Sequence, residues 1–534
     1  MAENWLWWRD GVIYQIYPRS FMDSNNDGIG DLPGITSKLD YLADLGVAGL
    51  WLSPIYPSPD VDFGYDVADY CDIDPKYGTM ADFEDLVNEA RKRQIHIILD
   101  LVMNHTSNQH PWFEAARTSR DDPHHDWYIW KDPKPGHKPP NNWASIFGGG
   151  GWEYVPELGQ FYFHMFYKEQ PDLNWRNPAV RKEMLDVYRF WLGKGVDGFR
   201  LDVFNAYFKD ENFRDNPPAL GIRAFERMRH IHDTNQPEMI PLLKEIRSLL
   251  DEKPGRYAVG ETFIGDEKIT AMYCAPGLLH QAFNFRFTSC SWNPARFLSA
   301  IQSWESALEP GSWPNYVLSN HDTPRPATRY GRGEDDERLK VAAALLLTQR
   351  GTPFMYYGDE IGMRDIPLSH EEIMDPIGKR YWPIFKGRDG CRSPMQWNAS
   401  SHAGFSEKEP WLKVHENYPQ RNVSIQKTDP NSLFHFFRRL IHLRRENVAL
   451  REGMFQPLIY EPRYLLAYLR RTDQQTILVA MNFGRRRRRF VLGRSLAGAQ
   501  WELLLSNKRD HLVFSQGDML PLEGEEVCII RMLS

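Results

Sequence analysis

The 534-residue sequence has few cysteines, no long apolar run and no excess of basic residues. Its five cysteines are odd in number, scattered and without paired spacing, which argues against a disulfide framework or a zinc site and favours the reducing cytoplasm. No run of about eighteen apolar residues occurs, so no membrane-spanning helix is expected. With 71 acidic residues against 64 Lys plus Arg, the net charge of −7 argues against nucleic acid as a partner. The first residues also lack the basic and apolar regions of a secretory signal peptide.

Length and aromatic content are the informative positive features. The chain is longer than one compact domain of about 100–200 residues requires, which favours a large barrel with additions or several domains. Aromatic residues make up 13% of the sequence. Flat rings with polar tips suit clefts that bind sugars, although most of these rings must pack in the core.

Eight short apolar runs alternate with helix-like stretches over the first two thirds of the chain, and most of the runs end in a polar residue. Buried strands that alternate with helices are typical of an α/β fold. Eight of them predict a (β/α)8 TIM barrel. The runs are 11–18, 47–54, 96–105, 198–205, 257–263, 282–287, 315–322 and 353–360.

Uneven spacing of these runs predicts additions to the barrel. The stretch after the third strand is long, aromatic and rich in Gly and Pro, so we expect an inserted lobe at 105–172 between barrel parts 1–104 and 173–449. A long loop, 361–430, follows the eighth strand. Short alternating segments then predict a C-terminal antiparallel β domain over 450–534.

Five consecutive arginines, 485–489, lie between two predicted strands of the C-terminal domain. A basic run of this kind can bind an anion, or its charge can keep an exposed strand turn from pairing with other edges. The exposed turn is the favoured interpretation.

Charged residues follow several of the predicted strands, at the end of the barrel where such enzymes carry their active sites. Arg200 and Asp202 are two apart on one strand, so they share a face, and the arginine favours the ionised carboxylate that a nucleophile requires. Asp322 ends a later run, Glu261 lies near the end of another, and Asp100 lies within an earlier one. Any one of these can form a structural ion pair, but carboxylates from several strands converging on one rim indicate a catalytic site.

Four segments, in this order, closely resemble the motif regions of the α-amylase superfamily, glycoside hydrolase family 13. They are DLVMNH (100–105), GFRLDVFN (198–205), GETF (260–263) and LSNHD (318–322). Four more resemble its α-glucosidase and oligo-1,6-glucosidase branch, namely WWRDGVIYQIYPRSF (7–21), GYDVADY (64–70), QPDLNW (170–175) and RSPMQW (392–397). The resemblance implies an exo-acting α-glucosidase that releases α-glucose from the non-reducing end of short α-glucosides with retention of configuration.

The resemblance also implies roles for single residues. Asp202 matches the nucleophile that forms a covalent glucosyl intermediate, Glu261 the general acid/base, and Asp322 the third carboxylate, which stabilises the transition state. In a retaining pair the two carboxyl groups lie about 5–5.5 Å apart, with a raised pKa at the acid and a low one at the nucleophile.

Further residues are implied at the site of the terminal glucose. They are Tyr65, Asp66, His105, Arg200, His321 and Arg392. Among them, Asp66 and Arg392 are expected to hold the outer hydroxyls and close the pocket. Phe147 and Phe166 of the inserted lobe are expected as pocket walls, with core packing as the alternative.

Val203, the residue after the implied nucleophile, bears on bond preference. In this branch a valine here tends to accompany cleavage of α-1,6 bonds, whereas alanine or threonine tends to accompany α-1,4. A branched apolar side chain at the strand end shapes the entry to the site without offering a hydroxyl. We therefore expect a lean towards α-1,6 linkages, with plain barrel packing of Val203 as the alternative.

The segment DSNNDGIGD (23–31) spaces oxygen atoms as a loop for a hard cation does. The expected ligands are Asp23, Asn25, Asp27, the Ile29 carbonyl and Asp31. Position twelve is Gly34, not the glutamate of an EF-hand, and a polar turn is the alternative. The resemblance implies structural Ca²⁺ or Mg²⁺ here, and no organic cofactor is expected.

Two other functions stay open at this point. A glucosyl-transferring or isomerising enzyme, similar to trehalose synthase or a transglucosidase, shares the scaffold and the covalent intermediate. A non-catalytic relative that partners a membrane transporter is the third possibility, against which the missing membrane helix and the intact carboxylates speak. We expect a small oligosaccharide or α-glucoside as the partner, and a monomer or weak homodimer.

Overall fold

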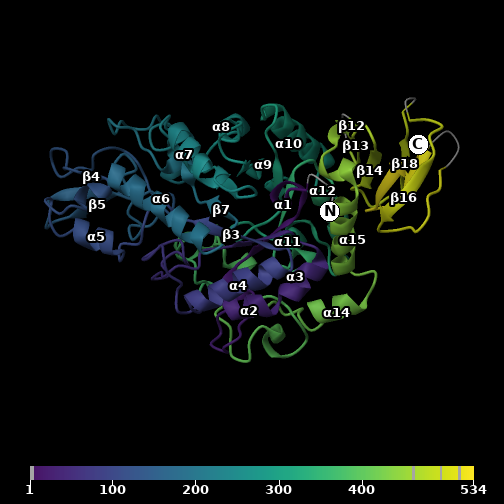
Figure 1. Ribbon diagram of the computed structural model, residues 1–534, viewed down its shortest axis with the longest axis horizontal. Helices are drawn as coiled ribbons and strands as arrows, with labels where there is room; N and C mark the ends of the chain where they lie inside the picture. The colour runs from purple at the N-terminus through teal and green to yellow at the C-terminus, as the bar shows by residue number, and fades with distance from the viewer. Residues whose placement is uncertain (1–4, 460–462, 494–495, 515–518, 534) are drawn as a thin grey trace.

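Eight parallel strands form the centre of the molecule (Figure 1). The structure is a computed structural model that describes residues 5–459, 463–493, 496–514 and 519–533. Neighbouring strands follow the order β10-β11-β1-β2-β3-β7-β8-β9, and β9 contacts β10, so the sheet closes into a nearly complete barrel. The strands are β1 (Ile13–Ile16), β2 (Gly49–Leu52), β3 (His96–Leu101), β7 (Gly198–Leu201), β8 (Tyr257–Glu261), β9 (Gln281–Phe283), β10 (Asn315–Val317) and β11 (Thr352–Tyr356). The predicted (β/α)8 barrel is confirmed.

Helices surround the barrel, and α4 (Met80–Lys92) shows why these segments are helical. Thr79 and Asp82 form a reciprocal capping box at its start. Its buried residues recur three or four positions apart, which lays one apolar face on the barrel. The other helices are α1 (Trp7–Asp10), α2 (Leu32–Ser37), α3 (Leu39–Leu45), α5 (Pro111–Ala116), α6 (Pro178–Gly193), α7 (Met239–Asp251), α8 (Glu267–Met272), α9 (Phe285–Thr288), α10 (Pro294–Ala307), α11 (Pro326–Tyr330), α12 (Glu337–Leu347), α13 (Pro376–Tyr381), α14 (Val423–Thr428), α15 (Leu433–Glu446) and α16 (Val448–Arg451).

The sixth predicted strand differs from the structure in its second half. The apolar run 282–287 was expected to be one strand, but β9 ends at Phe283 and α9 begins at Phe285. The side chain of Asn284 accepts a hydrogen bond from the backbone N–H of Arg286 and so caps the new helix. A single capping residue inside an apolar run therefore divides it into two elements.

A small lobe extends from the barrel within the segment 105–172 (left in Figure 1). Its antiparallel strands, in the order β4-β6-β5, are β4 (Trp130–Lys131), β5 (Trp152–Val155) and β6 (Gln160–Phe163). Around them lies an aromatic core that contains Trp143, Phe147 and Phe166. Val203 and Ile377, which come from outside the lobe, belong to the same core, so shared apolar packing holds the lobe beside the strand end of β7.

The C-terminal part is an antiparallel β structure at the opposite end of the molecule from the lobe (Figure 1). One sheet has the order β12-β13-β14-β18-β16, and β15 pairs with β17. The strands are β12 (Met454–Pro457), β13 (Leu465–Arg471), β14 (Thr476–Asn482), β15 (Arg488–Val491), β16 (Trp501–Ser506), β17 (Met519–Leu522) and β18 (Val527–Met532). The predicted antiparallel β domain is confirmed. No helix in the described part of the chain is both long and apolar enough to span a membrane.

Candidate active site

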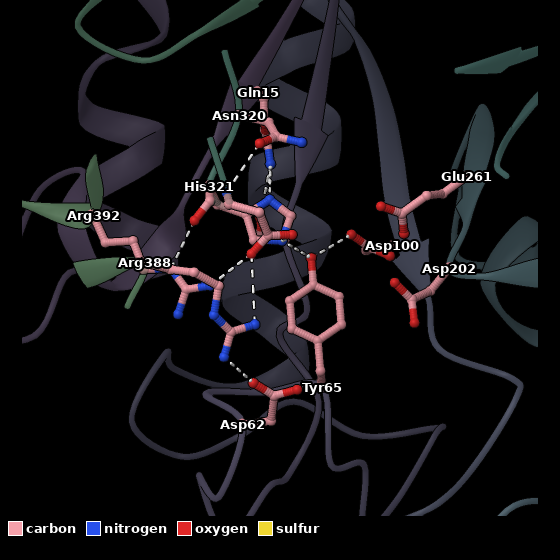
Figure 2. A network of polar contacts seen from close by, with 12 residues as sticks. Gln15, Asp62, Tyr65, Asp100, Asp202, Glu261, Asn320, His321, Arg388 and Arg392 are labelled. Atoms are coloured by element: carbon pink, nitrogen blue, oxygen red, sulfur yellow. Dashed lines mark hydrogen bonds and ion pairs between the residues drawn. The ribbon is translucent and has the colours of Figure 1, made fainter. Parts of the chain in front are cut away.

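Arg200 on β7 binds three carboxylates at once. Its Nη1 donates to Asp100 Oδ1 at 2.7 Å and to Asp202 Oδ1 at 2.6 Å, while Nη2 donates to Glu261. Asp100 lies on β3 and Glu261 ends β8, so three neighbouring strands deliver this cluster. Figure 2 shows Asp202 and Glu261 side by side. The structure thus brings together the implied nucleophile and the implied acid/base around one guanidinium.

The shared guanidinium changes the electrostatics expected for Asp202. Burial raises the pKa of this carboxyl well above its ordinary value, and the negative charges of Glu261 and Asp100 add to the rise, although Arg200 opposes it. Burial likewise raises the pKa of Asp100 to about 6. The direction for the protein without substrate thus differs from the low pKa expected of Asp202 beside Arg200. One guanidinium is shared among three carboxylates, which is why the pKa of Asp202 is raised although Arg200 binds it.

His321 fixes the position of Tyr65 beside this cluster. Its Nδ1 lies 2.8 Å from Gln15 Nε2 and its Nε2 lies 2.8 Å from the Tyr65 hydroxyl. That hydroxyl also lies 3.0 Å from Asp100 Oδ2, and the rings of Tyr65 and His321 are stacked. Burial lowers the pKa of His321 to about 3, so the imidazole is neutral. A neutral ring with two occupied nitrogens serves to position its neighbours.

Asp322 faces a different environment from the other two carboxylates. It accepts a hydrogen bond from Arg392 Nη2 at 2.9 Å and lies 3.6 Å from Arg388 Nη1. Burial opposes its ionised form, but the surrounding positive charges outweigh this and hold the pKa of Asp322 well below its usual range. Its side chain is 35% exposed, whereas that of Asp202 is 8% exposed. Asp322 is therefore an ionised carboxylate open to a ligand.

Arg388 and Asp62 are two charged residues of the site that sequence reasoning missed. Arg388 Nη2 donates to Asp62 Oδ1 at 2.7 Å and to Asp375 Oδ1 at 2.9 Å. In Figure 2 this pair lies beside Tyr65, on the side away from Asp202. Asp62 lies three residues before Tyr65, and Arg388 four before Arg392. Their positions close to the recognised motifs were the signal in the sequence that could have identified Asp62 and Arg388.

The predicted role of Asp66 needs correction. Its side chain is fully buried, Oδ1 accepts hydrogen bonds from the Ser58 hydroxyl and the Asp62 backbone N–H, and Oδ2 accepts one from the Val61 N–H. Burial raises its pKa to about 6. The Asp66 carboxylate therefore makes its hydrogen bonds within its own loop, where it fixes the loop conformation and positions Asp62. Arg392 is buried too, and its Nε donates to the carbonyl of His321, so it positions the His321–Asp322 turn.

His105 and the two predicted aromatic walls lie against these residues. His105 Nε2 contacts the Tyr65 carbonyl at 2.9 Å and Gln170 Nε2 at 3.0 Å, and burial lowers the pKa of His105 to about 4. The Phe166 ring lies 4.9 Å from His105, and Arg388 lies 5.3 Å from the ring centre of Phe147. Both phenylalanines are buried in the lobe core beside site residues, and their role as pocket walls stays a prediction.

Val203 follows Asp202 in an unusual backbone conformation. Its φ is +35°, in the left-handed region that a branched side chain rarely adopts. It begins the turn Phe204–Ala206 and packs in the lobe core and not inside the barrel. Strain of this kind costs of order 1–3 kcal/mol and persists where surrounding structure enforces it, often beside active sites. The plain barrel-packing alternative for Val203 is therefore wrong.

The predicted cation loop, 23–31, is shaped by its own backbone. Asp23 accepts hydrogen bonds from the N–H groups of Asn25, Asn26 and Gly28 at 2.7–3.1 Å. Asp31 accepts from Ser24 and Gly34. In the described ranges no group of three or more His, Cys, Asp or Glu side chains is arranged to hold a metal ion. Metal binding at Asp23, Asn25, Asp27, Ile29 and Asp31 stays a prediction.

Known proteins share this architecture. The family model for the α-amylase catalytic domain matches residues 15–453. A probable α-glucosidase of Rhizobium meliloti (strain 1021) is 42% identical over 494 residues, covering 89% of each chain. An oligo-1,6-glucosidase of Parageobacillus thermoglucosidasius is 39% identical and covers 94% of this chain and 95% of its own.

Solved structures agree with the sequence comparisons. An α-glucosyl transfer enzyme superposes with a TM-score of 0.93 at 38% identity, covering 99% of this chain and 100% of its own. The trehalulose synthase of Pseudomonas mesoacidophila superposes with a TM-score of 0.91 at 34% identity, with the same coverage. The barrel, the Arg200-centred carboxylates and these matches identify the chain as a member of the α-amylase family of glycoside hydrolases, family 13, in its α-glucosidase branch.

Proposed function

We propose that the protein is an exo-acting α-glucosidase that releases α-glucose from the non-reducing end of short α-glucosides. The observation that carries the proposal is the cluster in which Arg200 binds both Asp202 and Glu261, with the ionised Asp322 nearby. The names of relatives, α-glucosidase and oligo-1,6-glucosidase, support the same activity.

The proposed reaction is a double displacement at the anomeric carbon. Asp202 attacks the anomeric carbon while Glu261 transfers its proton to the leaving oxygen, which gives a glucosyl ester on Asp202 and a free alcohol. Glu261 then takes a proton from water, and the resulting hydroxide displaces Asp202. Two successive inversions retain the α configuration.

The Asp62–Arg388 pair is proposed to hold the outer hydroxyls of the terminal glucose. Arg388 ties Asp62 to Asp375, and Gln170 Nε2 donates to the second oxygen of Asp62 at 3.3 Å. A charged pair fixed on several sides closes the far side of the sugar site, which favours removal of single terminal units. This pair takes over the role first expected of Asp66 and Arg392.

Asp62→Asn is expected to lower kcat/KM for α-glucosides about 10- to 100-fold, because a hydrogen bond to a charged group contributes about 1.5–3 kcal/mol. Its melting temperature should change little, since the amide keeps the shape. Asp66→Asn is the matched control, and it should lower the melting temperature through its loop while changing kcat/KM less. Steady-state kinetics and thermal unfolding of both variants check this. A larger kinetic loss in Asp66→Asn would restore the original assignment.

Glucosyl transfer is the second candidate, favoured by the high structural similarity to an α-glucosyl transfer enzyme and a trehalulose synthase. Hydrolysis and transfer share the intermediate and differ in whether water or a sugar accepts the glucosyl group. Incubation with maltose, isomaltose, sucrose and trehalose, followed by identification of the products, separates the two. Free glucose as the main product at low sugar concentration supports hydrolysis, and isomeric disaccharides as the main product support transfer.

We propose a lean towards α-1,6 linkages because of Val203. Val203→Thr exchanges a methyl for a hydroxyl at the same shape, which is worth only about 1–3 kcal/mol of discrimination, and should shift the activity ratio from isomaltose towards maltose. Ile377→Val, a truncation in the same apolar core, is the control and should leave the ratio unchanged. If the wild type strongly prefers maltose and Val203→Thr leaves the ratio of the two activities unchanged, the proposed preference for α-1,6 linkages is wrong. The glucosidase assignment does not depend on that preference.

We propose that loop 23–31 binds Ca²⁺ or Mg²⁺. Its donors are all oxygens, which suits a hard cation, and one carboxylate oxygen of Asp23 and one of Asp31, Oδ2 in each case, accepts a single backbone hydrogen bond and keeps a second lone pair. The loop is also joined to a distant segment, since the N–H of Trp411 donates to the Gly28 carbonyl. A bound cation is therefore expected to support stability and not the chemical step.

A chelator should lower the melting temperature, because a ligand that binds only the folded state stabilises it by about 2.7 kcal/mol at 100 times its Kd. Asp27→Ala should lower the melting temperature to a similar value and abolish the response to chelator. The Asp27 side chain is exposed and contacts only its own loop, so other losses are small. If the melting curve is unchanged and elemental analysis finds no metal, the cation site is contradicted and the loop is a polar turn.

We further propose a cytoplasmic protein that is a monomer or weak homodimer. All five cysteines are free in the structure, and four of them are buried, which supports a reducing compartment. Sedimentation of the purified protein tests the oligomeric state.

A further inference from the structure

A basic cavity lies between the barrel and the C-terminal domain, outside the candidate active site. Its volume is about 530 Å³. Two of its arginines, Arg332 and Arg338, come from the α11–α12 turn and α12, and the others come from the C-terminal domain. The full set of lining arginines is Arg332, Arg338, Arg463, Arg485, Arg486 and Arg488. No acidic side chain belongs to this lining among the described residues.

The charge of this cavity is far from balanced. Glu525 supplies one carboxylate, whose Oε1 contacts Arg338 Nη2 at 2.9 Å and Arg332 Nη1 at 3.2 Å. Across the described part of the chain, Arg463, Arg486 and Arg488 form no ion pair with a carboxylate. Burial lowers the pKa of Arg338, and the charge of Arg332 adds to that effect. Six guanidinium groups line a cavity whose lining contains no carboxylate, so they repel one another unless an anion joins them.

The Arg488 guanidinium is held with a donor available, whereas the donors of Arg338 bind Glu525 and the Tyr330 carbonyl. The Arg488 guanidinium lies 4.3 Å above the centre of the Tyr464 ring, and its buried Nε has no hydrogen-bond partner. Arg338 lies over the Trp292 ring at 5.2 Å. Stacking on an aromatic ring fixes a guanidinium plane while its N–H edge stays free for the oxygens of a phosphate.

The turn that carries the arginine run is fixed before any ligand binds. Asn482 Nδ2 donates to the Arg486 carbonyl at 2.9 Å, and Asn482 Oδ1 accepts from the Gly484 N–H at 3.0 Å. Trp292 Nε1 donates to the carbonyl of Phe483 at 3.1 Å, which ties the turn to the barrel. Protection of an exposed strand edge from pairing explains why residues 485–489 are charged. It does not explain why arginines of three other segments lie beside them.

We propose that this cavity binds a small anion carrying two or more phosphate groups, such as a triphosphate, and that the ligand bridges the barrel and the C-terminal domain. The concave shape and limited volume suit a compact ligand. The chain as a whole carries a net charge of −7, which repels a nucleic acid or an anionic membrane outside this one cavity. The exposed-turn interpretation of 485–489 is thereby replaced for the residues that line the cavity.

The arginine run provides a matched control, because only some of its arginines line the cavity. Arg486 and Arg488 line the cavity, whereas Arg487, which pairs with Glu523 at 3.1 Å, and Arg489 do not. Arg486→Gln with Arg488→Gln and Arg487→Gln with Arg489→Gln therefore remove the same charge from neighbouring positions. If the first pair fails to fold, Arg463→Gln, at an exposed cavity position, replaces it.

The test is calorimetric titration of the full chain with tripolyphosphate, ATP and inorganic phosphate at physiological salt, together with thermal unfolding. We expect saturable one-to-one binding of tripolyphosphate, a raised melting temperature, at least tenfold weaker binding in the cavity variant and less than twofold change in the control. Equal affinity for ATP and tripolyphosphate identifies the phosphate chain as the ligand, and tighter ATP binding identifies a nucleotide. Absence of saturable binding, equal loss in both variants, or tighter binding of an oligonucleotide overturns the proposal.

Discussion

Asp202→Ala is expected to lower kcat for every α-glucoside by more than about a thousandfold, because without the nucleophile no covalent intermediate forms. The fold should persist. Arg200 keeps hydrogen bonds to Asp100 and Glu261 when Asp202 is removed, so no buried charge is left alone. Activity within tenfold of the wild type contradicts the assignment of Asp202.

The same substitution has an expected effect on stability against pH. A carboxyl whose pKa is raised on folding contributes stability that is present below its unfolded pKa and is lost as the pH rises through its folded pKa. Burial raises the pKa of Asp202 well above its usual range and that of Asp100 to about 6. The melting temperature of the wild type should therefore fall from pH 5 to pH 8 more steeply than that of Asp202→Ala. Parallel curves for the two proteins contradict the raised pKa of Asp202.

Glu261→Gln is expected to lower hydrolysis of natural glucosides by about 10²–10⁴-fold, the usual contribution of general acid–base catalysis. Aryl glucosides with good leaving groups need little protonation, so the first step should be largely spared. The second step lacks its base, and the glucosyl intermediate should accumulate. A rapid burst of released phenol followed by slow turnover checks this.

The control for this variant is the wild type on the same aryl glucosides, which should show steady release without a burst. Glu261 and Gln have the same shape, and the amide still reaches Arg200, so thermal unfolding should be little changed. Equal loss on natural and aryl substrates, without a burst, argues against the acid role of Glu261.

Strand periodicity explains why the reacting residues could be predicted from the sequence. Asp202 follows β7 and Glu261 ends β8, and the ends of parallel barrel strands meet at one rim whatever the loops do. The alternation of apolar runs and helix-like stretches predicted the barrel for the same reason. The sixth strand was predicted too long because an apolar run does not show where a capping residue such as Asn284 starts a helix.

Loop geometry explains what sequence reasoning missed. Asp62 and Asp66 are four residues apart, as are Arg388 and Arg392, so each loop offered two candidates of one charge. Which of them meets the sugar depends on hydrogen bonds within the loop, such as those that use up Asp66. The raised pKa of Asp202 was missed for a related reason, since the sequence showed its arginine but not that Arg200 is shared with Asp100 and Glu261.

The anomeric configuration of the first glucose released tests the central claim most directly. Proton NMR of a reaction with an aryl α-glucoside, whose leaving group is not a sugar, distinguishes the two anomers of the released glucose when it is recorded before mutarotation. The account predicts α-glucose, because attack by Asp202 and displacement by water each invert the anomeric carbon. Initial release of β-glucose, which requires a single displacement by water, would contradict it.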